Sequence, residues 1–156
     1  MNQIKKAVEE KMTTIDDDLK KFDEVLAREK EAAERQASSL HETSNELIPL
    51  LKKIRERRIF FQGVETKYRS TRGPVLGHDI DDNALFIYDI DRESPIRLDL
   101  YDDEEKLTSW INIIKRTGYV NAIISLKNTL TLIDNIMIKA EENISELNSD
   151  LNKYDK

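Results

Sequence analysis

Apolar residues recur every seven positions along the first third of the chain. One series runs unbroken through Met12, Leu19, Leu26, Ala33, Leu40, Leu47 and Ile54. A second series, three residues later in each heptad, is apolar at Val8, Ile15, Phe22 and Leu50 but polar at Glu29, Gln36 and Thr43. Two such series form the a and d positions of a coiled-coil seam. The pattern predicts a long helix over residues 1–58 that buries one narrow stripe with a polar centre.

Pro49 lies inside this helical pattern, at a heptad position away from the seam. Proline lacks a backbone donor and crowds the carbonyl group four residues earlier, so it kinks or ends a helix. We expect a kink or a short break near Asn45–Ile48. The alternative is a new helix capped by Ser44 or Asn45.

A second heptad pattern occupies the last part of the chain. Its ten a and d positions are all apolar or aromatic: Ile123, Leu126, Leu130, Ile133, Met137, Ala140, Ile144, Leu147, Leu151 and Tyr154. The pattern predicts a helix from about Tyr119 to about Lys153. The first half carries further apolar residues beside the seam, at Ile124, Leu132, Ile136 and Ile138. We therefore expect this half to be packed on more than one side.

The period changes to two between the helices. Alternation at residues 64–68, an apolar run at 84–88 and alternation at 96–101 predict strands near 64–69, 84–90 and 96–101. The turn residues 91–95 predict that the last two strands form a hairpin. Residues 73–77 contain two glycines and a proline, which indicates a loop.

A short helix is predicted after the strands. Asp102 and Glu105 have the spacing of a capping box, and basic residues at 115 and 116 suit the negative end of the helix dipole. Leu107, Trp110, Ile111 and Ile114 are its expected buried face. Gly118 is expected to end the helix or to bend it into the C-terminal one.

These elements predict a mainly α protein with a small α+β insert. Two long coiled-coil helices flank a module of three or four antiparallel strands and one short helix. The expected divisions are residues 1–58 for the N-terminal helix, 59–118 for the α/β module and 119–156 for a C-terminal helix that packs with the first.

The two helices differ in length, and this difference bears on assembly. In an antiparallel hairpin the C-terminal helix reaches back only to about residue 20, at ~1.5 Å per residue. The apolar residues before that point overhang, and an exposed apolar edge favours a partner. We expect a homo-oligomer, with a dimer as the first guess; a single hairpin with a frayed N-terminus is the alternative. The expected oligomer or partner seam comprises Val8, Met12, Ile15, Leu19, Phe22, Leu26, Ile123, Leu126, Leu130, Ile133, Met137, Ile144, Leu147 and Leu151.

Composition narrows the class of protein. Charged residues make up 36% of the chain, which suits long helices with a narrow buried stripe. The chain has no cysteine, which excludes disulfides and thiolate chemistry and fits a reducing compartment. No signal peptide and no apolar run of about 20 residues is present, so we expect a soluble, cytoplasmic protein that does not bind membranes.

Two acidic groups are candidate reactive sites. His78, Asp79, Asp81 and Asp82 are weak candidates for a divalent cation, and a solvated acidic loop is the default interpretation. Asp89, Asp91 and Glu93 alternate in sequence but approach a predicted turn, where acids are common. No phosphate loop, nucleophile elbow or zinc-protease spacing occurs. The sequence therefore predicts no catalytic residue and no cofactor, and a protein that is not an enzyme.

Charge is distributed unevenly, although the net charge is −6. A basic segment contains Lys52, Lys53, Arg55, Arg57, Arg58, Lys67, Arg69 and Arg72. Residues 79–105 carry eleven acids and two bases. The basic segment is a possible contact surface for nucleic acid. The alternative, which we favour, is that the two segments neutralise each other within one module.

The sequence thus favours a non-enzymatic structural or adaptor protein that oligomerises through its helices and binds a protein partner. One alternative is a nucleic-acid-binding module that uses Lys52–Arg72. Another is an assembly or secretion chaperone subunit.

Overall fold

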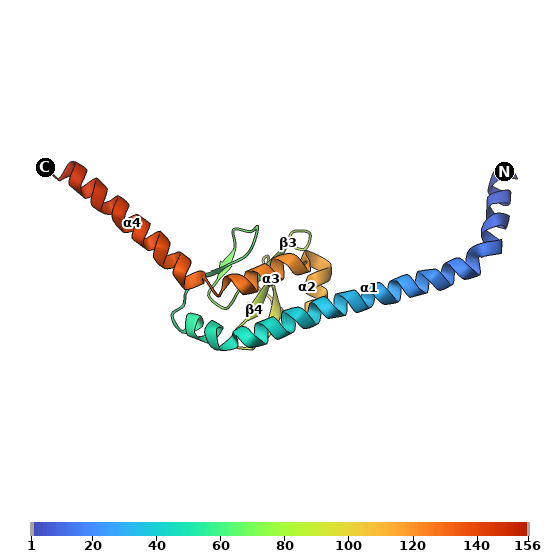
Figure 1. The fold of residues 1–156 in the computed structure, drawn as a ribbon, viewed down its shortest axis with the longest axis horizontal. Coiled ribbons are helices and arrows are strands. Elements are labelled where there is room, and N and C mark those ends of the chain that lie inside the picture. The colour runs from blue at the N-terminus through green and yellow to red at the C-terminus, as the bar shows by residue number, and fades with distance from the viewer. Residues whose placement is uncertain (1, 156) are drawn as a thin grey trace.

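A computed structural model describes residues 2–155 and shows a compact head from which two helical arms project (Figure 1). The first helix, α1, runs from Asn2 to Glu56. Residues 2–36 of α1 form the N-terminal arm, and the last helix, α4 (Leu132–Tyr154), forms the C-terminal arm. The head comprises residues 37–131, which include the remainder of α1.

The head contains a four-stranded antiparallel sheet. Its strands are β3 (Val75–Asp79), β4 (Ala84–Asp89), β5 (Ser94–Asp99) and β6 (Glu105–Leu107), and each pairs with the next along the chain. The register of β4 and β5 pairs Ile87 with Ile96, which confirms the predicted hairpin. A separate two-stranded sheet joins β1 (Phe61–Gln62) to β2 (Arg69–Ser70).

Two helices complete the head. Ser109 caps α2 (Trp110–Thr117) by accepting a hydrogen bond from the backbone N–H of Asn112, and Gly118 ends it as predicted. The φ of Gly118 is 91°, a value that favours glycine. The next helix, α3 (Tyr119–Asn128), follows at once and carries Ala122 and Leu126 into the core.

The sheet is buried on both faces, so β4 is apolar at successive positions rather than at alternate ones. Phe86 and Tyr88 face a large core formed with α1, α2 and α3. Leu85 and Ile87 face a smaller core with Val75 and Ile96. Side chains alternate between the faces of a strand, so an uninterrupted apolar run requires both faces to be covered.

The last part of α1 belongs to the main core. Leu40, Leu47, Leu51 and Ile54 are buried there, and Pro49 lies on the exposed side. α1 is helical through Pro49, so neither the expected break nor a new helix at Ser44 or Asn45 occurs. Burial of the flanking leucines holds the helix together across the missing backbone donor. Figure 1 shows the helix changing direction in this teal part.

The predicted C-terminal helix is two helices, because residues 129–131 form a turn between α3 and α4. Thr129 is buried, and its hydroxyl donates to the Leu126 carbonyl at 2.6 Å. Such a bond competes with the helical pairing of that carbonyl. The break lets Leu126 stay in the core while Leu130 emerges on the surface.

The predicted packing of the C-terminal helix against the N-terminal helix forms only for its first part, α3; α4 does not pack on α1. α1 packs on α2 and α3. The two arms leave the head in opposite directions (Figure 1). The turn at 129–131 directs α4 away from α1, so the antiparallel hairpin expected from the two heptad patterns is wrong for a single chain.

Three local predictions in the insert are also wrong. Residues 73–77 were expected as a loop but contain the start of β3, and residues 64–68 form the turn between β1 and β2. The helix expected from Asp102 begins at Trp110, because residues 105–107 pair with β5 instead. Leu107, expected on the buried helix face, is therefore exposed on β6. Pairing between strands overrides the capping-box pattern.

Within residues 2–155, no helix combines the length and the apolar character that crossing a bilayer requires.

The main core predicts a clear contrast in stability. Leu51 is fully buried, and its replacement by alanine should lower the free energy of unfolding by about 2–5 kcal/mol through a cavity in the head. Leu107, which is exposed, is the control, and Leu107→Ala should change the free energy of unfolding by less than about 0.5 kcal/mol. Urea unfolding of both variants measures the difference. Equal losses would contradict this description of the core.

Candidate functional site

The N-terminal arm carries an apolar stripe along one side that nothing in the chain covers. Its members recur at helical spacing and, apart from the part-buried Ile15, are between 43% and 69% exposed. The N-terminal stripe comprises Ile4, Val8, Met12, Ile15, Leu19, Phe22, Val25 and Leu26. Most of these residues belong to the predicted seam, and Ile4 and Val25 extend it.

The C-terminal arm carries a matching stripe. No residue of α4 is buried. The C-terminal stripe comprises Ile133, Ile136, Met137, Ala140, Ile144, Leu147, Leu151 and Tyr154. Ile136 and Ile138 are exposed, so the packing predicted for this half of the helix on more than one side is not made by α4 within the chain.

Two predicted seam residues have a different role. Ile123 and Leu126 lie on α3 and are 9% and 0% exposed, so they are core residues of the head and unavailable to a partner. Leu130, in the turn, is 62% exposed. Sequence periodicity groups all three in one seam because a heptad pattern does not show where a helix breaks.

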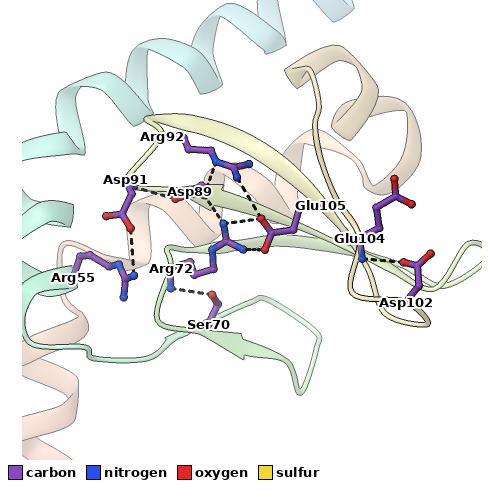
Figure 2. A network of polar contacts seen from close by, with 9 residues as sticks. All are labelled: Arg55, Ser70, Arg72, Asp89, Asp91, Arg92, Asp102, Glu104 and Glu105. Carbon is purple, nitrogen blue, oxygen red and sulfur yellow. Dashed lines mark hydrogen bonds and ion pairs between the residues drawn. The ribbon is translucent and has the colours of Figure 1, made fainter.

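A network of charges centred on Arg72 joins the loop before β3 to the sheet (Figure 2). The Arg72 Nη2 donates to Asp89 Oδ2 at 2.7 Å and to Glu105 Oε2 at 3.0 Å. Asp89 is only 2% exposed and also accepts a hydrogen bond from the backbone N–H of Asp91. Arg92 Nε lies 3.7 Å from Asp89 Oδ2, and Arg92 Nη2 lies 3.6 Å from Glu105 Oε2. The guanidinium groups therefore compensate the buried carboxylate.

The same contacts shift two pKa values. The hydrogen bond from Arg72 lowers the pKa of Glu105, and the charges of Arg72 and Arg92 act in the same direction. The pKa of Arg72 is raised, mainly by its hydrogen bond to Glu105. Both groups are thus held in their charged forms.

Other members of the basic segment face acids of the same head. Arg55 Nη2 lies 3.3 Å from Asp91 Oδ2, and Lys52 Nζ lies 3.6 Å from Glu93 Oε1. Arg72 is paired as described above. The favoured prediction, neutralisation within one module, thus holds for three of the eight basic residues. Asp91 and Glu93, considered as reactive carboxylates, are also ion-paired.

Five basic residues make no ion pair within the described part of the chain: Lys53, Arg57, Arg58, Lys67 and Arg69. Among them, Arg69 lies over the Phe60 ring at 4.3 Å, an arrangement that stabilises the cation through the ring face.

The weak metal candidates are arranged around Arg116. Its Nε donates to Asp79 Oδ2 at 2.7 Å, and its Nη2 donates to Asp82 Oδ2 at 2.5 Å. His78 instead lies 3.4 Å from Asn83 Oδ1. No group of three or more potential metal-ligating side chains occurs in residues 2–155. The guanidinium occupies the place between the Asp79 and Asp82 carboxylates that a cation would take. Sequence spacing does not reveal this contact, because Arg116 lies on α2, 37 residues after Asp79 and 34 residues after Asp82.

Comparison with known proteins gives no relative: no family model matches the chain, and no curated protein or solved structure is significantly similar to it.

The Arg72 network should be important for stability. Arg72→Gln leaves the Asp89 carboxylate buried with only the more distant Arg92 nearby, and should lower the free energy of unfolding by about 2–4 kcal/mol. Arg69→Gln is the control, because Arg69 is exposed and lies three residues before Arg72. Chemical denaturation measures both. A loss below about 0.5 kcal/mol for Arg72→Gln would refute this role.

Glu105 predicts a pH dependence. An unfolded glutamate titrates near pH 4.3. Because the folded pKa is lower, Glu105 stabilises the protein above about pH 4.3, and this contribution is lost as the pH falls through the folded pKa. The stability of the unaltered protein should therefore decrease more steeply below that pH than that of Glu105→Gln. Urea midpoints measured across this range compare them, and parallel curves would count against the assignment. The pKa of Asp99 is also lowered, but Asp99 is present in both proteins and so does not contribute to the difference between their curves.

Proposed function

We propose that this protein is a non-enzymatic scaffold or adaptor that associates with itself through its two arms and presents its α/β head to a protein partner. The observation that carries the proposal is the pair of uncovered apolar stripes, one on each arm. Contiguous exposed apolar surface of this kind usually marks an interaction site.

Association has a substantial driving force. Fully burying a leucine, isoleucine or phenylalanine side chain contributes about 1.5–3 kcal/mol, and about half of each side chain in the stripes is still exposed. Covering the stripes should therefore contribute about 1 kcal/mol per residue, over more than a dozen residues. Association costs ~4–15 kcal/mol in lost rotation and translation, so the gain exceeds this cost only if most of both stripes are covered. This requirement favours a partner that covers both arms.

The head supplies a surface for a different partner. Tyr101 and Leu107 are 82% and 69% exposed at the β6 side of the sheet. β6 has only three residues and is an edge strand of the four-stranded sheet. An edge strand offers backbone donors and acceptors to an incoming chain. We infer that this edge is the place where the head meets its partner.

Contact with nucleic acid is the alternative outcome, and it has less support. Three of the eight basic residues are paired with acids of the head. Fluorescence anisotropy with duplex DNA at ~50 mM salt distinguishes the two functions, because phosphate contacts are strongest at low salt. Binding that Arg57→Glu and Arg58→Glu abolish would favour this alternative. An assembly or secretion chaperone is a specialised form of the protein-binding function.

Self-association should depend on the stripe and not on the opposite side of the arm. Phe22→Glu combined with Leu26→Glu places two charges in the apolar surface, at a cost of about 1–3 kcal/mol each, so the dissociation constant should rise at least tenfold. Thr14→Glu combined with Ala27→Glu adds the same charges at exposed positions off the stripe and should leave the dissociation constant unchanged. Sedimentation equilibrium over a range of protein concentrations measures each mass. An unaltered protein that stays monomeric would overturn the proposal.

A further inference from the structure

We propose that a second copy of this chain covers both stripes at once, in a closed dimer with exchanged arms. The N-terminal stripe of each copy packs antiparallel against the C-terminal stripe of the other copy. This inference rests on the proposed function, since it specifies how the arms associate. It goes further by naming the occupant, the direction and the residue register of the interface.

The two stripes match in length. The N-terminal stripe extends over residues 4–26 and the C-terminal stripe over residues 133–154. At ~1.5 Å per residue they are about 33 Å and 32 Å long, measured along the helix axis. Figure 1 shows that the dark-blue first turns of α1 bend away from the rest of the arm, so pairing over the full length requires α1 to straighten there. The N-terminal stripe is followed by Glu29 and the polar centre of the first heptad pattern. The polar centre therefore sets the end of the apolar surface that a partner helix can cover.

One antiparallel register places an apolar residue opposite an apolar residue in six consecutive layers, with Lys5 opposite Tyr154 at the outer end. In antiparallel coiled coils, a positions of one helix meet d positions of the other. The six layers pair Leu26 with Ile133, Phe22 with Met137, Leu19 with Ala140, Ile15 with Ile144, Met12 with Leu147 and Val8 with Leu151. A shift of one heptad places Glu29 opposite Met137, and a shift the other way places Lys5 opposite Leu147. Burial of an unpaired charge disfavours both shifts.

The flanking positions support this register on one side and predict a salt effect on the other. Val25 comes beside Ile136, and Lys11 comes beside Asp150, on one side of the seam. On the other side, Asp16 approaches Glu141 and Asp23 approaches Asp134. Like charges at such positions oppose association, and salt screens them. The dimer should therefore become tighter as the salt concentration rises, the opposite of the nucleic-acid alternative.

The directions of the arms allow this arrangement to close. The N-terminal arm and α4 leave opposite sides of the head (Figure 1). A two-fold rotation places the two heads side by side, so that each N-terminal arm lies along the α4 of the other copy with the chains antiparallel. A parallel pairing would place the second head at the tip of the N-terminal arm. Its own N-terminal arm would then be left for a third copy, which produces an open chain of subunits.

Cysteine cross-linking tests the register directly, because the chain has no cysteine of its own. A chain with Val8→Cys is mixed with a chain with Leu151→Cys, equilibrated and mildly oxidised. A covalent dimer that contains one chain of each kind is expected, because a disulfide requires Cα atoms within about 7 Å. Neither variant should cross-link by itself, and the mixture excludes a bond within one chain.

The matched control replaces Val8→Cys by Leu26→Cys. In the antiparallel register Leu26 lies about 27 Å along the helix from the position opposite Leu151, so no cross-link should form. In a parallel register Leu26 would lie opposite Leu151 and Val8 would not. Cross-linking of Leu26→Cys with Leu151→Cys, or of either Val8→Cys or Leu151→Cys alone, would overturn the proposal and leave self-association standing.

A second measurement covers the case in which a cysteine variant fails to associate. Lys11→Glu should weaken the unaltered dimer by about two- to tenfold, and Asp150→Lys in the same chain should restore it, because each interface then regains an opposite-charge pair. Sedimentation equilibrium measures the dissociation constants. A dimer that forms without this rescue has a different register, and a protein that is monomeric throughout contradicts the proposed function itself.

Discussion

The burial of the last turns of α1 against α2 and α3, in the core that they share with β4, is the contact on which the rest of the structure depends. Leu40, Leu47, Leu51 and Ile54 join this helix to the side chains of β4, α2 and α3 in one core. The core fixes the direction in which the N-terminal arm leaves the head. It also places α3 so that the turn at 129–131 sends α4 the other way. Both arms are consequently separated within one chain, and their stripes stay uncovered.

Electrostatics in the head serves the fold. Asp89 and Asp79 are buried carboxylates, and each is matched by an arginine that comes from a different segment: Arg72 for Asp89 and Arg116 for Asp79. Such pairs hold the loop before β3 and the end of α2 against the sheet, because a buried charge without its partner is costly. Three of the eight residues of the basic segment are thus ion-paired with acids of the head, and Arg116 of α2 adds a further pair.

Much of the fold could be predicted from periodicity. The heptad series through Met12 and Leu26 indicated the long first helix, and alternation with turn residues at 91–95 indicated the β4–β5 hairpin. Periodicity failed where a tertiary contact decided the local state. Glu105 to Leu107 became a strand through pairing with β5, and Thr129 ended a helix whose heptad pattern continues without interruption. The charge network was only partly visible, since pairing of Arg116 with Asp79 requires α2 to lie beside β3.

The sequence by itself determined which residues are apolar on each long helix, and therefore that the protein has two stripes of a coiled-coil kind. It did not determine whether those stripes cover each other. Heptad spacing is a property of one helix and carries no information about the direction of a neighbouring one. That direction was decided by the packing of α1 and α3 around the sheet and by the turn between α3 and α4. The exposed stripes of the arms follow from this tertiary arrangement.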